Sequence, residues 1–430
     1  MDNSQLFIFA LLIGCLATTI PVFIALFFTG LVGLVVVAGI DPQIVIEVLY
    51  RSMDKFALVV VLFFVLCGNI MTKGSIVRKL INTANVLVGF LPGGLAMAGI
   101  LACGFFGAIS GSTVATVVAI GGFMIPALLE NDYDEKFSIG VMTTAPILGI
   151  VIPPSISMIL YAMVSNDQLE ALFLTGFIPG LMIVAAMCLY SYVVCKKMGM
   201  TRRPPPSVKE VLAVIRESVW ALLLPVVIFG GIYSGLFTAN EAAVVACFYA
   251  FFVEMFIHKD MRITDMKKVI VSSAVTSASL LIIVAGASVF GEYLTFEQVP
   301  SKIATMVIEN ISSPWAFLLA VNILLLIIGM FMDLISATII LTPIFLPLLS
   351  KFGIDTMHFG LLMTINLGIG YCTPPLGVSL YISGAVANRN LLYVSRAVLP
   401  CVFIQIAILM ILTYWPDLVL FLPRLVYGNN

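Results

Sequence analysis

A short segment in the first half of the sequence, residues 107–116, has the residue types of a cation site. Its glycines free the backbone to turn. Its serines and threonines can cap the amides of a helix N-terminus and leave hydroxyl and carbonyl oxygens for a metal ion. Small hydroxyl residues also serve close packing between membrane helices, and that alternative stays open. The residues of interest in this segment are Ser110, Gly111, Ser112, Thr113 and Thr116.

A second segment of the same kind, residues 332–338, adds a carboxylate. Asp333 is the only acidic residue in the two segments, and a charge inside a bilayer is costly unless it is paired or functional. Ser336 and Thr338 follow it at positions where a helix would begin. The segment therefore has the oxygen donors of a second cation site, with helix packing again as the alternative.

Two Pro-Pro pairs interrupt apolar runs further along each half: Pro153-Pro154 and Pro374-Pro375. Each proline removes a backbone donor and clashes with the preceding turn, so neither run can remain a regular α-helix. The freed carbonyls need partners, and a hard cation such as Na⁺ is one way to supply them. A structural kink satisfied by neighbouring helices is the alternative. Residues near the two breaks that could contribute oxygens or backbone freedom are Thr143, Thr144, Gly149, Ser155, Asn366, Gly370 and Thr373.

The elements that must position these segments are membrane helices. Of the 430 residues, 61% are hydrophobic and only 10% are charged, against about 25% charged in a soluble domain. Spanning a bilayer takes roughly 20 apolar residues in a helix. The sequence therefore predicts an all-α integral membrane protein. Its clearest spans are residues 171–195, 216–237, 240–257, 267–291 and 397–422.

Several classes of function are not supported by any motif. The chain has no G-x-x-x-x-G-K-[ST] loop for ATP, no serine-histidine-aspartate or HExxH arrangement for an enzyme, and no CxxC pair among its eight cysteines. Its basic residues lie in short loops, which is an orientation signal and not a nucleic-acid patch. Only two histidines are present, so the proton relay of a pump is not expected.

The sequence contains an internal repeat, so that its two halves are related. An offset of 221 residues maps Pro126 onto Pro347, Gly149 onto Gly370 and the first Pro-Pro pair onto the second. Chance matching in an apolar chain is the alternative, but a Pro-Pro pair inside an apolar run is uncommon. We predict a first repeat at residues 1–200, a cytoplasmic linker at 201–215 and a second repeat at 216–430.

Each repeat is expected to contain one re-entrant helical hairpin, at residues 88–130 and 315–350. Both are broken, near 104–113 and 329–333. If each hairpin enters and leaves on one side, each half has five crossings, so the second half lies upside down relative to the first. The four clusters of basic residues then all face the cytoplasm. About ten transmembrane helices plus two hairpins, in an inverted repeat, is a design that secondary transporters use.

Four stretches together resemble the large membrane subunit of the TRAP transporters, the tripartite ATP-independent periplasmic transporters. These are residues 104–126, 145–155, 329–347 and 370–375. The resemblance covers essentially the whole chain and implies a bacterial inner-membrane location. It also implies Na⁺-coupled uptake of a small carboxylate, of the C4-dicarboxylate or sialic acid type. The expected mechanism is an elevator, in which a transport domain (about 88–163 and 315–386) slides against a scaffold made of the rest. The implied partners are a small four-helix membrane subunit, as a separate chain, and a periplasmic substrate-binding protein.

The resemblance also implies roles for individual residues. The first Na⁺ site would involve Ser110, Gly111, Ser112, Gly149 and Pro153, and the second Asp333, Ser336, Thr338, Gly370, Thr373 and Pro374. The substrate would be held by Ser112, Thr113, Thr116, Pro154, Ser155, Asn366 and Pro375.

Three other functions stay open from the residues alone. One is a stand-alone Na⁺/dicarboxylate carrier of similar inverted-repeat design. Another is the permease of an ATP-driven importer, which would need a cytoplasmic coupling helix and an ATPase partner. The last is a structural membrane scaffold, which would have no need of two broken-helix sites at the midplane.

Overall fold

A computed structural model describes residues 3–18, 20–55, 57–200, 204–311, 313–374 and 377–428. Throughout these ranges the chain is helix, turn or loop, with no strand. Nine helices in the described part are long and apolar enough to cross a membrane, or ten if one bent pair forms a single span. The expectation of an all-helical, multi-pass membrane protein is confirmed.

The first half contains thirteen α-helices, several of them short pieces of an interrupted span. They are α1 (Asn3–Ala17), α2 (Val22–Leu31), α3 (Pro42–Met53), α4 (Ala57–Lys73), α5 (Ile76–Val88), α6 (Gly94–Ser110), α7 (Thr113–Thr116), α8 (Gly122–Glu130), α9 (Glu135–Thr144), α10 (Leu148–Val151), α11 (Ile156–Ser165), α12 (Leu169–Thr175) and α13 (Phe177–Lys197). A π-helical stretch, Val117–Gly121, joins α7 to α8.

The second half repeats this order with fewer interruptions. It contains α14 (Val208–Tyr233), α15 (Ala239–Phe252), α16 (Ile263–Phe296), α17 (Val299–Asn310), α18 (Pro314–Phe331), α19 (Leu334–Phe352), α20 (Thr356–Gly370), α21 (Val378–Ala387), α22 (Leu391–Tyr414) and α23 (Pro416–Tyr427). The turn before α15 is closed by a capping box between Thr238 and Glu241, as the T-x-x-E sequence predicts.

Residues at equivalent positions cap or end the helices in the same way in both halves. Asp134 caps α9 by accepting a hydrogen bond from the backbone of Phe137 at 2.8 Å, and Asp355 caps α20 in the same way. Asn166 and Asn388 end α11 and α21 in the left-handed conformation, with φ of 60° and 50°, which asparagine tolerates better than most residues. The two halves therefore start and stop their broken helices with the same chemistry.

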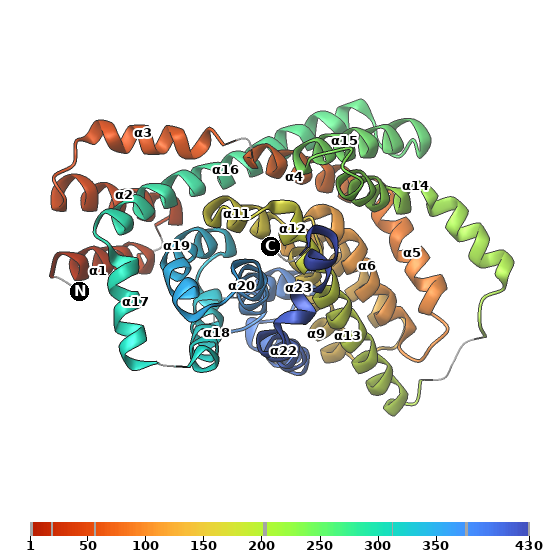
Figure 1. The fold of residues 1–430 in the computed structure, drawn as a ribbon. Coiled ribbons are helices and arrows are strands. Elements are labelled where there is room, and N and C mark those ends of the chain that lie inside the picture. The colour runs from red at the N-terminus through yellow and green to blue at the C-terminus, as the bar shows by residue number, and fades with distance from the viewer. Residues whose placement is uncertain are drawn as a thin grey trace.

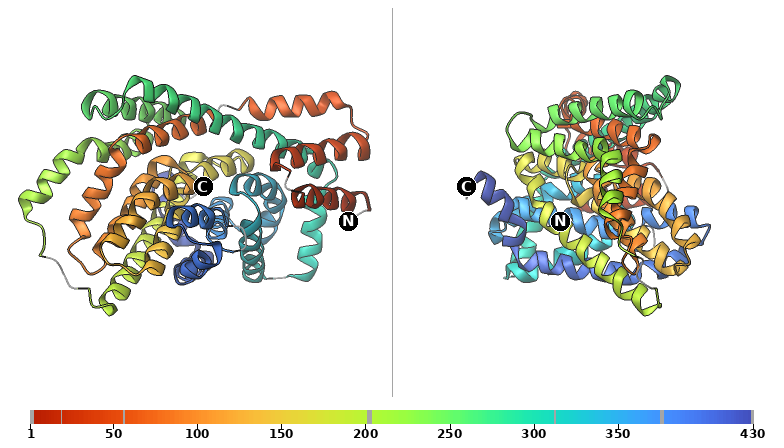
Figure 2. Two further views of the ribbon diagram at one scale, coloured as in Figure 1. Left: turned by 180° about the vertical axis from the view of Figure 1, so that it is seen from behind. Right: turned by 90° about the vertical axis from the view of Figure 1, so that its right-hand side faces the viewer.

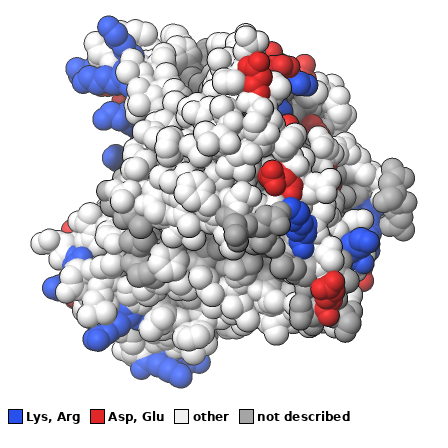
Figure 3. Space-filling view, turned by 90° about the vertical axis from the view of Figure 1, so that its left-hand side faces the viewer, with Lys and Arg blue, Asp and Glu red and all other residues white. Residues whose placement is uncertain are grey.

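The helices form an outer layer and an inner cluster (Figure 1). Helices α4, α14, α15 and α16 run along one edge, and α5 and α17 descend from the two ends of this layer. The two broken helices (α9–α11 and α20–α21) and the two hairpins (α6–α8 and α18–α19) lie between them, with α13 and α22. The views from behind and from the side show the same division (Figure 2). Charged side chains lie toward the margins of the molecule, around a broad face with few charges (Figure 3).

The breaks are shorter than the sequence suggested. Helix α6 continues through Gly104 and Gly107 to Ser110, and α18 continues through Gly329 to Phe331. Gly149, expected within a break, lies inside α10, and the chain leaves the helix only at Ile152. Glycine disfavours a helix by only about 1 kcal/mol, and close helix packing at these glycines maintains the helical conformation.

Candidate substrate and cation site

The first hairpin turns at two residues, Gly111 and Ser112. Gly111 has a φ of +61°, a conformation that glycine adopts without steric cost. Ser112 caps α7: its hydroxyl accepts from the backbone of Ala115, and its carbonyl accepts from the Thr116 hydroxyl at 2.7 Å. The Thr113 hydroxyl is buried and has no hydrogen-bond partner among the described residues. A buried hydroxyl without a partner is a group that a ligand could satisfy.

The second hairpin turns at Met332 and Asp333. The Asp333 carboxylate accepts a hydrogen bond from the backbone of Ser336 at 2.8 Å and so caps α19. The Thr338 hydroxyl donates to the carbonyl of Leu334. The Ser336 hydroxyl, like that of Thr113, is buried with no described partner. The second tip thus presents a carboxylate at a helix N-terminus, where the helix dipole favours negative charge.

Each hairpin meets the broken helix of its own half through a pair of glycines. A Cβ atom on Gly107 would lie 2.6 Å from the Cα atom of Gly149. A Cβ on Gly370 would lie 2.5 Å from the carbonyl carbon of Gly329. Contacts this close exclude any side chain, so the backbones of hairpin and broken helix touch directly in both halves.

The first break joins the first hairpin tip through the backbone. The N–H of Ile156, at the start of α11, donates to the carbonyl of Gly111 at 3.3 Å. Ser155 caps α11, and its hydroxyl hydrogen-bonds Ser157 at 2.9 Å. Gly149 packs against the tip itself, because a Cβ there would lie 2.7 Å from the Thr116 hydroxyl oxygen. The structure therefore brings the predicted residues of the first site together with the Pro153-Pro154 break.

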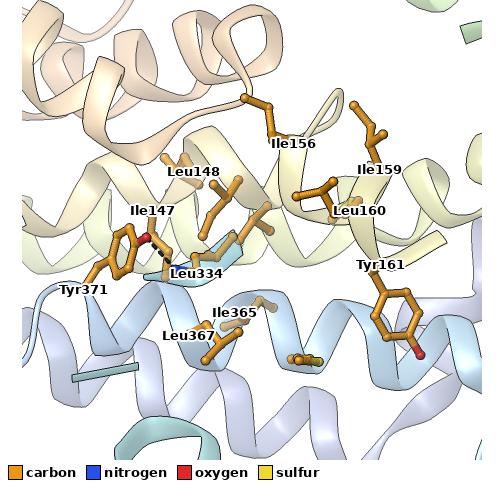
Figure 4. Close-up of a cluster of buried hydrophobic side chains, with 14 of the residues drawn as sticks. Ile147, Leu148, Ile156, Ile159, Leu160, Tyr161, Leu334, Ile365, Leu367 and Tyr371 are labelled. Carbon is orange, nitrogen blue, oxygen red and sulfur yellow. Dashed lines mark hydrogen bonds between the residues drawn. The ribbon is translucent and has the colours of Figure 1, made fainter. Parts of the chain in front are cut away.

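The second break is joined to its hairpin tip by Tyr371. The backbone N–H of Leu334 donates to the Tyr371 hydroxyl oxygen at 2.6 Å (Figure 4). The Thr373 hydroxyl, in the turn after α20, instead donates to the carbonyl of Ile369 in that helix. No hydrogen bond of the described residues links Thr373 to Asp333. Pro374 lies in the turn after α20, whereas Pro375 lies outside the described residues. The second predicted site is thus less compact than the first.

Asn366, Thr143 and Thr144 make hydrogen bonds within or between helices, although the Asn366 side-chain oxygen is buried with no partner among the described residues. Both threonines donate to carbonyls one turn back in α9. The Asn366 amide donates to the side chain of Asn322, which in turn donates to Thr413, so these residues tie α18, α20 and α22 together. Polar side chains on membrane helices often bond across helices in this way.

A cavity of about 420 Å³ lies where the two hairpin tips face the outer layer. The first tip contributes Ser110, Gly111, Ser112 and Thr113, and the second contributes Leu334 and Ile335. Helix α4 closes the opposite side with Asn69 and Thr72, and α16 with Thr276 and Leu280. Such a volume is in the range of small-molecule sites.

Among the described residues, no lysine, arginine, histidine or acidic residue lines the cavity. Its polar groups are hydroxyls, one side-chain amide and backbone groups near the first residues of α7, α11 and α19. Helix N-termini carry partial positive charge and unsatisfied N–H groups, and so favour anions. The lining is mostly apolar, and its few polar groups could bind the anionic group of a small solute without a fixed positive side chain.

Five polar lining residues were missed by reasoning from the sequence: Asn69, Thr72, Ser157, Thr276 and Tyr371. Asn69 is anchored to α16 by a hydrogen bond to Ser273 at 2.8 Å. A polar side chain within an apolar span was the available signal for Asn69. Thr72 and Thr276 needed the fold, because nothing in the sequence places α4 and α16 opposite the hairpin tips.

Polar contacts between the halves brace the broken helices at their outer ends. Arg389, which follows α21, makes a bidentate ion pair with Glu135 at the start of α9, at 2.7 and 3.1 Å. The paired carboxylate raises the pKa of the Arg389 guanidinium above its ordinary value. At the other junction, Thr356 donates to Asp167 at 2.7 Å. The end of each broken helix is thus bonded to the start of the broken helix in the other half.

Fold and site together define a multi-pass helical membrane protein in which residues of two hairpins and two broken helices line a shared cavity. Residues 9–418 match the family model described as the tripartite ATP-independent periplasmic transporter, DctM component. The chain belongs to this family.

The relatives and a solved structure agree with this assignment. The chain is 37% identical to the C4-dicarboxylate TRAP transporter large permease protein of Rhodobacter capsulatus, over 98% of this chain and 99% of the relative. It is 41% identical to the protein of that name from Pseudomonas aeruginosa (92% and 93%), and 33% identical to the sialic acid TRAP transporter large permease protein of Vibrio cholerae (97% and 97%). The YdaH transporter of Alcanivorax borkumensis shares the fold, with a TM-score of 0.64 at 13% identity, covering 87% of this chain and 88% of that one.

Proposed function

We propose that this large permease performs Na⁺-coupled uptake of a small organic carboxylate, and that the solute binds in the cavity between the hairpin tips and α4 and α16. The observation that carries the proposal is the cavity itself, which both tips and the outer layer share. A site shared between two packed units can be opened to either side when one unit moves against the other.

The chemistry of the lining supports a carboxylate substrate. Hydroxyls and an amide can donate to carboxylate oxygens, and the partial positive charge of three nearby helix N-termini favours an anion. Of the three relatives described above, two are named as C4-dicarboxylate transporters and one as a sialic acid transporter. The higher identity to the first two favours a C4-dicarboxylate over sialic acid.

The same lining supports a coupling cation. An anion placed here meets no positive side chain, so a bound cation would balance its charge and raise its affinity. Oxygen donors suitable for Na⁺ are available at the tips: the Thr113 and Ser336 hydroxyls without described partners, the Ser112 hydroxyl and the Asp333 carboxylate. Na⁺ bound before the solute would thereby couple the two gradients.

We infer an elevator motion from the packing. The moving unit would be the inner cluster. The scaffold would be the outer layer of α4 and α14–α16, together with α1–α3. Helices α13 and α22 pack on α6 and α9 in the inner cluster, so we place them with the moving unit and not with the scaffold as the sequence had suggested. Helices α5 and α17 would be the connecting arms.

The proposed partners are those of a tripartite system: a separate small four-helix membrane subunit on the scaffold and a periplasmic substrate-binding protein. The proposed location is the bacterial inner membrane. Uptake of a radiolabelled C4-dicarboxylate into proteoliposomes tests the proposal, with the chain alone, with each partner and with both. We expect uptake only with both partners and an inward Na⁺ gradient. Uptake without the binding protein would indicate a stand-alone carrier, and uptake that needs ATP would indicate an importer permease.

A further inference from the structure

The turn between α4 and α5 is held by a buried carboxylate from α15. Glu254 lies in the π-helical end of that helix, Val253–Ile257, and its side chain is fully buried. One carboxylate oxygen accepts from the backbone N–H of Ile76 at 2.8 Å, and the other accepts from the N–H of Ser75 at 3.1 Å. Both donors belong to the N-terminal end of α5.

This contact replaces the cap that α5 lacks locally. Ser75 is the N-cap residue of α5, but its hydroxyl makes no capping bond. The first N–H groups of a helix have no partner within the helix, and a carboxylate at that end is favoured by the helix dipole. A residue 179 positions away therefore supplies what the local sequence does not.

Gly74 and His258 complete the arrangement. A Cβ on Gly74 would lie 2.1 Å from the Glu254 carboxylate carbon, so only glycine leaves room for the carboxylate. His258, one turn after Glu254, is buried, and its Nδ1 lies 3.1 Å from the Ser75 hydroxyl oxygen. Carboxylate, imidazole and hydroxyl enclose the α4–α5 turn.

The position of this turn gives the contact a mechanical role. Helix α4 packs against α15 and α16 in the outer layer, whereas α5 packs both on α14 of that layer and on α6, and leads into the first hairpin. The chain from scaffold to first hairpin passes through Gly74 and Ser75. An arm that is fixed at one end can turn about that end without translating.

We propose that Glu254 is a positioning residue for transport: it fixes the scaffold end of α5, so that the first hairpin moves about a pivot at Gly74-Ser75. This inference rests on the elevator motion proposed above. It assigns Glu254 no contact with substrate or cation, since it acts through the backbone of Ser75 and Ile76.

Kinetics of two variants test the pivot. Glu254→Gln keeps one acceptor and loses the charge, and should lower the maximal uptake rate about tenfold, the effect of losing a charge-assisted hydrogen bond, with KM unchanged. Gly74→Ala should do the same by displacing the carboxylate. The controls are Glu241→Gln, at the other end of α15, and Gly230→Ala, where a Cβ meets nothing within 4 Å. Because both substitutions act on one contact, the double variant should be no slower than the slower single variant.

A distance measurement separates failure of the pivot from failure of the elevator. Spin labels at Phe123→Cys on α8 and Val275→Cys on α16, both exposed, report the inner cluster against the outer layer after the native cysteines are replaced. We expect two distance populations in the otherwise unsubstituted transporter, and a broadened distribution in both pivot variants. An unchanged rate and distribution in both variants would overturn the pivot alone. A single fixed distance in the unsubstituted transporter during active transport would overturn the elevator and the pivot with it.

Discussion

The hydroxyl oxygen of Tyr371 accepts a hydrogen bond from the backbone N–H of Leu334 at 2.6 Å. Tyr371 is the first residue after α20, and Leu334 is the first residue of α19. One side chain therefore connects the second break to the second hairpin tip, and both residues line the cavity. We expect this bond to couple a change at the tip to the break.

Replacing Tyr371 with phenylalanine should weaken this connection and slow transport. The Leu334 N–H would be left without its partner in a buried site, which costs about 1–3 kcal/mol, and we expect apparent substrate affinity to fall about tenfold. The measurement is the substrate concentration dependence of uptake in proteoliposomes. Tyr381→Phe on α21, where the ring is exposed, is the control and should leave affinity unchanged. Equal affinities for the two variants would show that the bond is not used.

Alanine at Gly149 or at Gly370 should destabilise the fold. Gly149→Ala would place a Cβ 2.7 Å from the Thr116 hydroxyl oxygen, and Gly370→Ala one 2.5 Å from the carbonyl carbon of Gly329. Overpacking of this kind typically costs about 1–3 kcal/mol, to be measured as the free energy of unfolding in detergent. Gly122→Ala, with no atom within 4 Å, should be neutral or slightly stabilising. Equal stability of all three variants would contradict the close backbone contact.

Loss of a hydroxyl at the predicted cation sites should weaken the response to Na⁺. For Ser112→Ala and Thr373→Ala we expect the Na⁺ concentration for half-maximal uptake to rise several-fold, by about 1 kcal/mol for each lost ligand or supporting hydrogen bond. The control is Thr295→Ala in α16, which removes a hydroxyl that donates one turn back in the same way as that of Thr373. Unchanged Na⁺ activation in both variants would refute the assignment of these residues.

His258 should make the fold sensitive to acid. Burial, with a smaller contribution from Lys79, holds the pKa of His258 below its ordinary value, against the opposing effect of Asp260; Glu254 also faces the ring. A histidine with a lowered pKa in the fold binds its proton more readily when unfolded, so stability is lost as pH falls below about 6.5. Thermal unfolding at pH 7.5 and 5.5 should show a smaller acid-induced loss for His258→Gln than for the unsubstituted protein. An equal loss would exclude this group.

Much of the fold could be predicted because its signals are local. Long apolar runs predict membrane helices, and Asp134 and Asp355 mark helix starts that recur at the repeat offset. The positions of the breaks were less well predicted, because glycine marks both a turn and a close contact. Gly111 turns the chain, but Gly107 and Gly149 permit two helices to touch. Only packing distinguishes these roles.

Part of the candidate site could be predicted because some of its residues also give a local signal. Ser110 to Thr113 could be found from residue type and spacing at one tip, and they do line the cavity. Asn69 and Thr276 come from helices of the outer layer, and their contribution depends on tertiary contacts. The Asn366 amide donates to Asn322 between helices, while its side-chain oxygen has no partner among the described residues. Residue type alone cannot separate these outcomes.

Coupled flux in one preparation tests the central proposal most directly. The large permease is reconstituted with both partners, and the movements of ²²Na⁺ and of a radiolabelled C4-dicarboxylate are followed together under Na⁺ gradients of either sign. We predict that the two ions move together in a fixed ratio, and that a sufficiently large reversal of the Na⁺ gradient reverses the carboxylate flux. Carboxylate flux without accompanying Na⁺, or at the same rate when K⁺ replaces Na⁺, would contradict Na⁺ coupling at the hairpin tips.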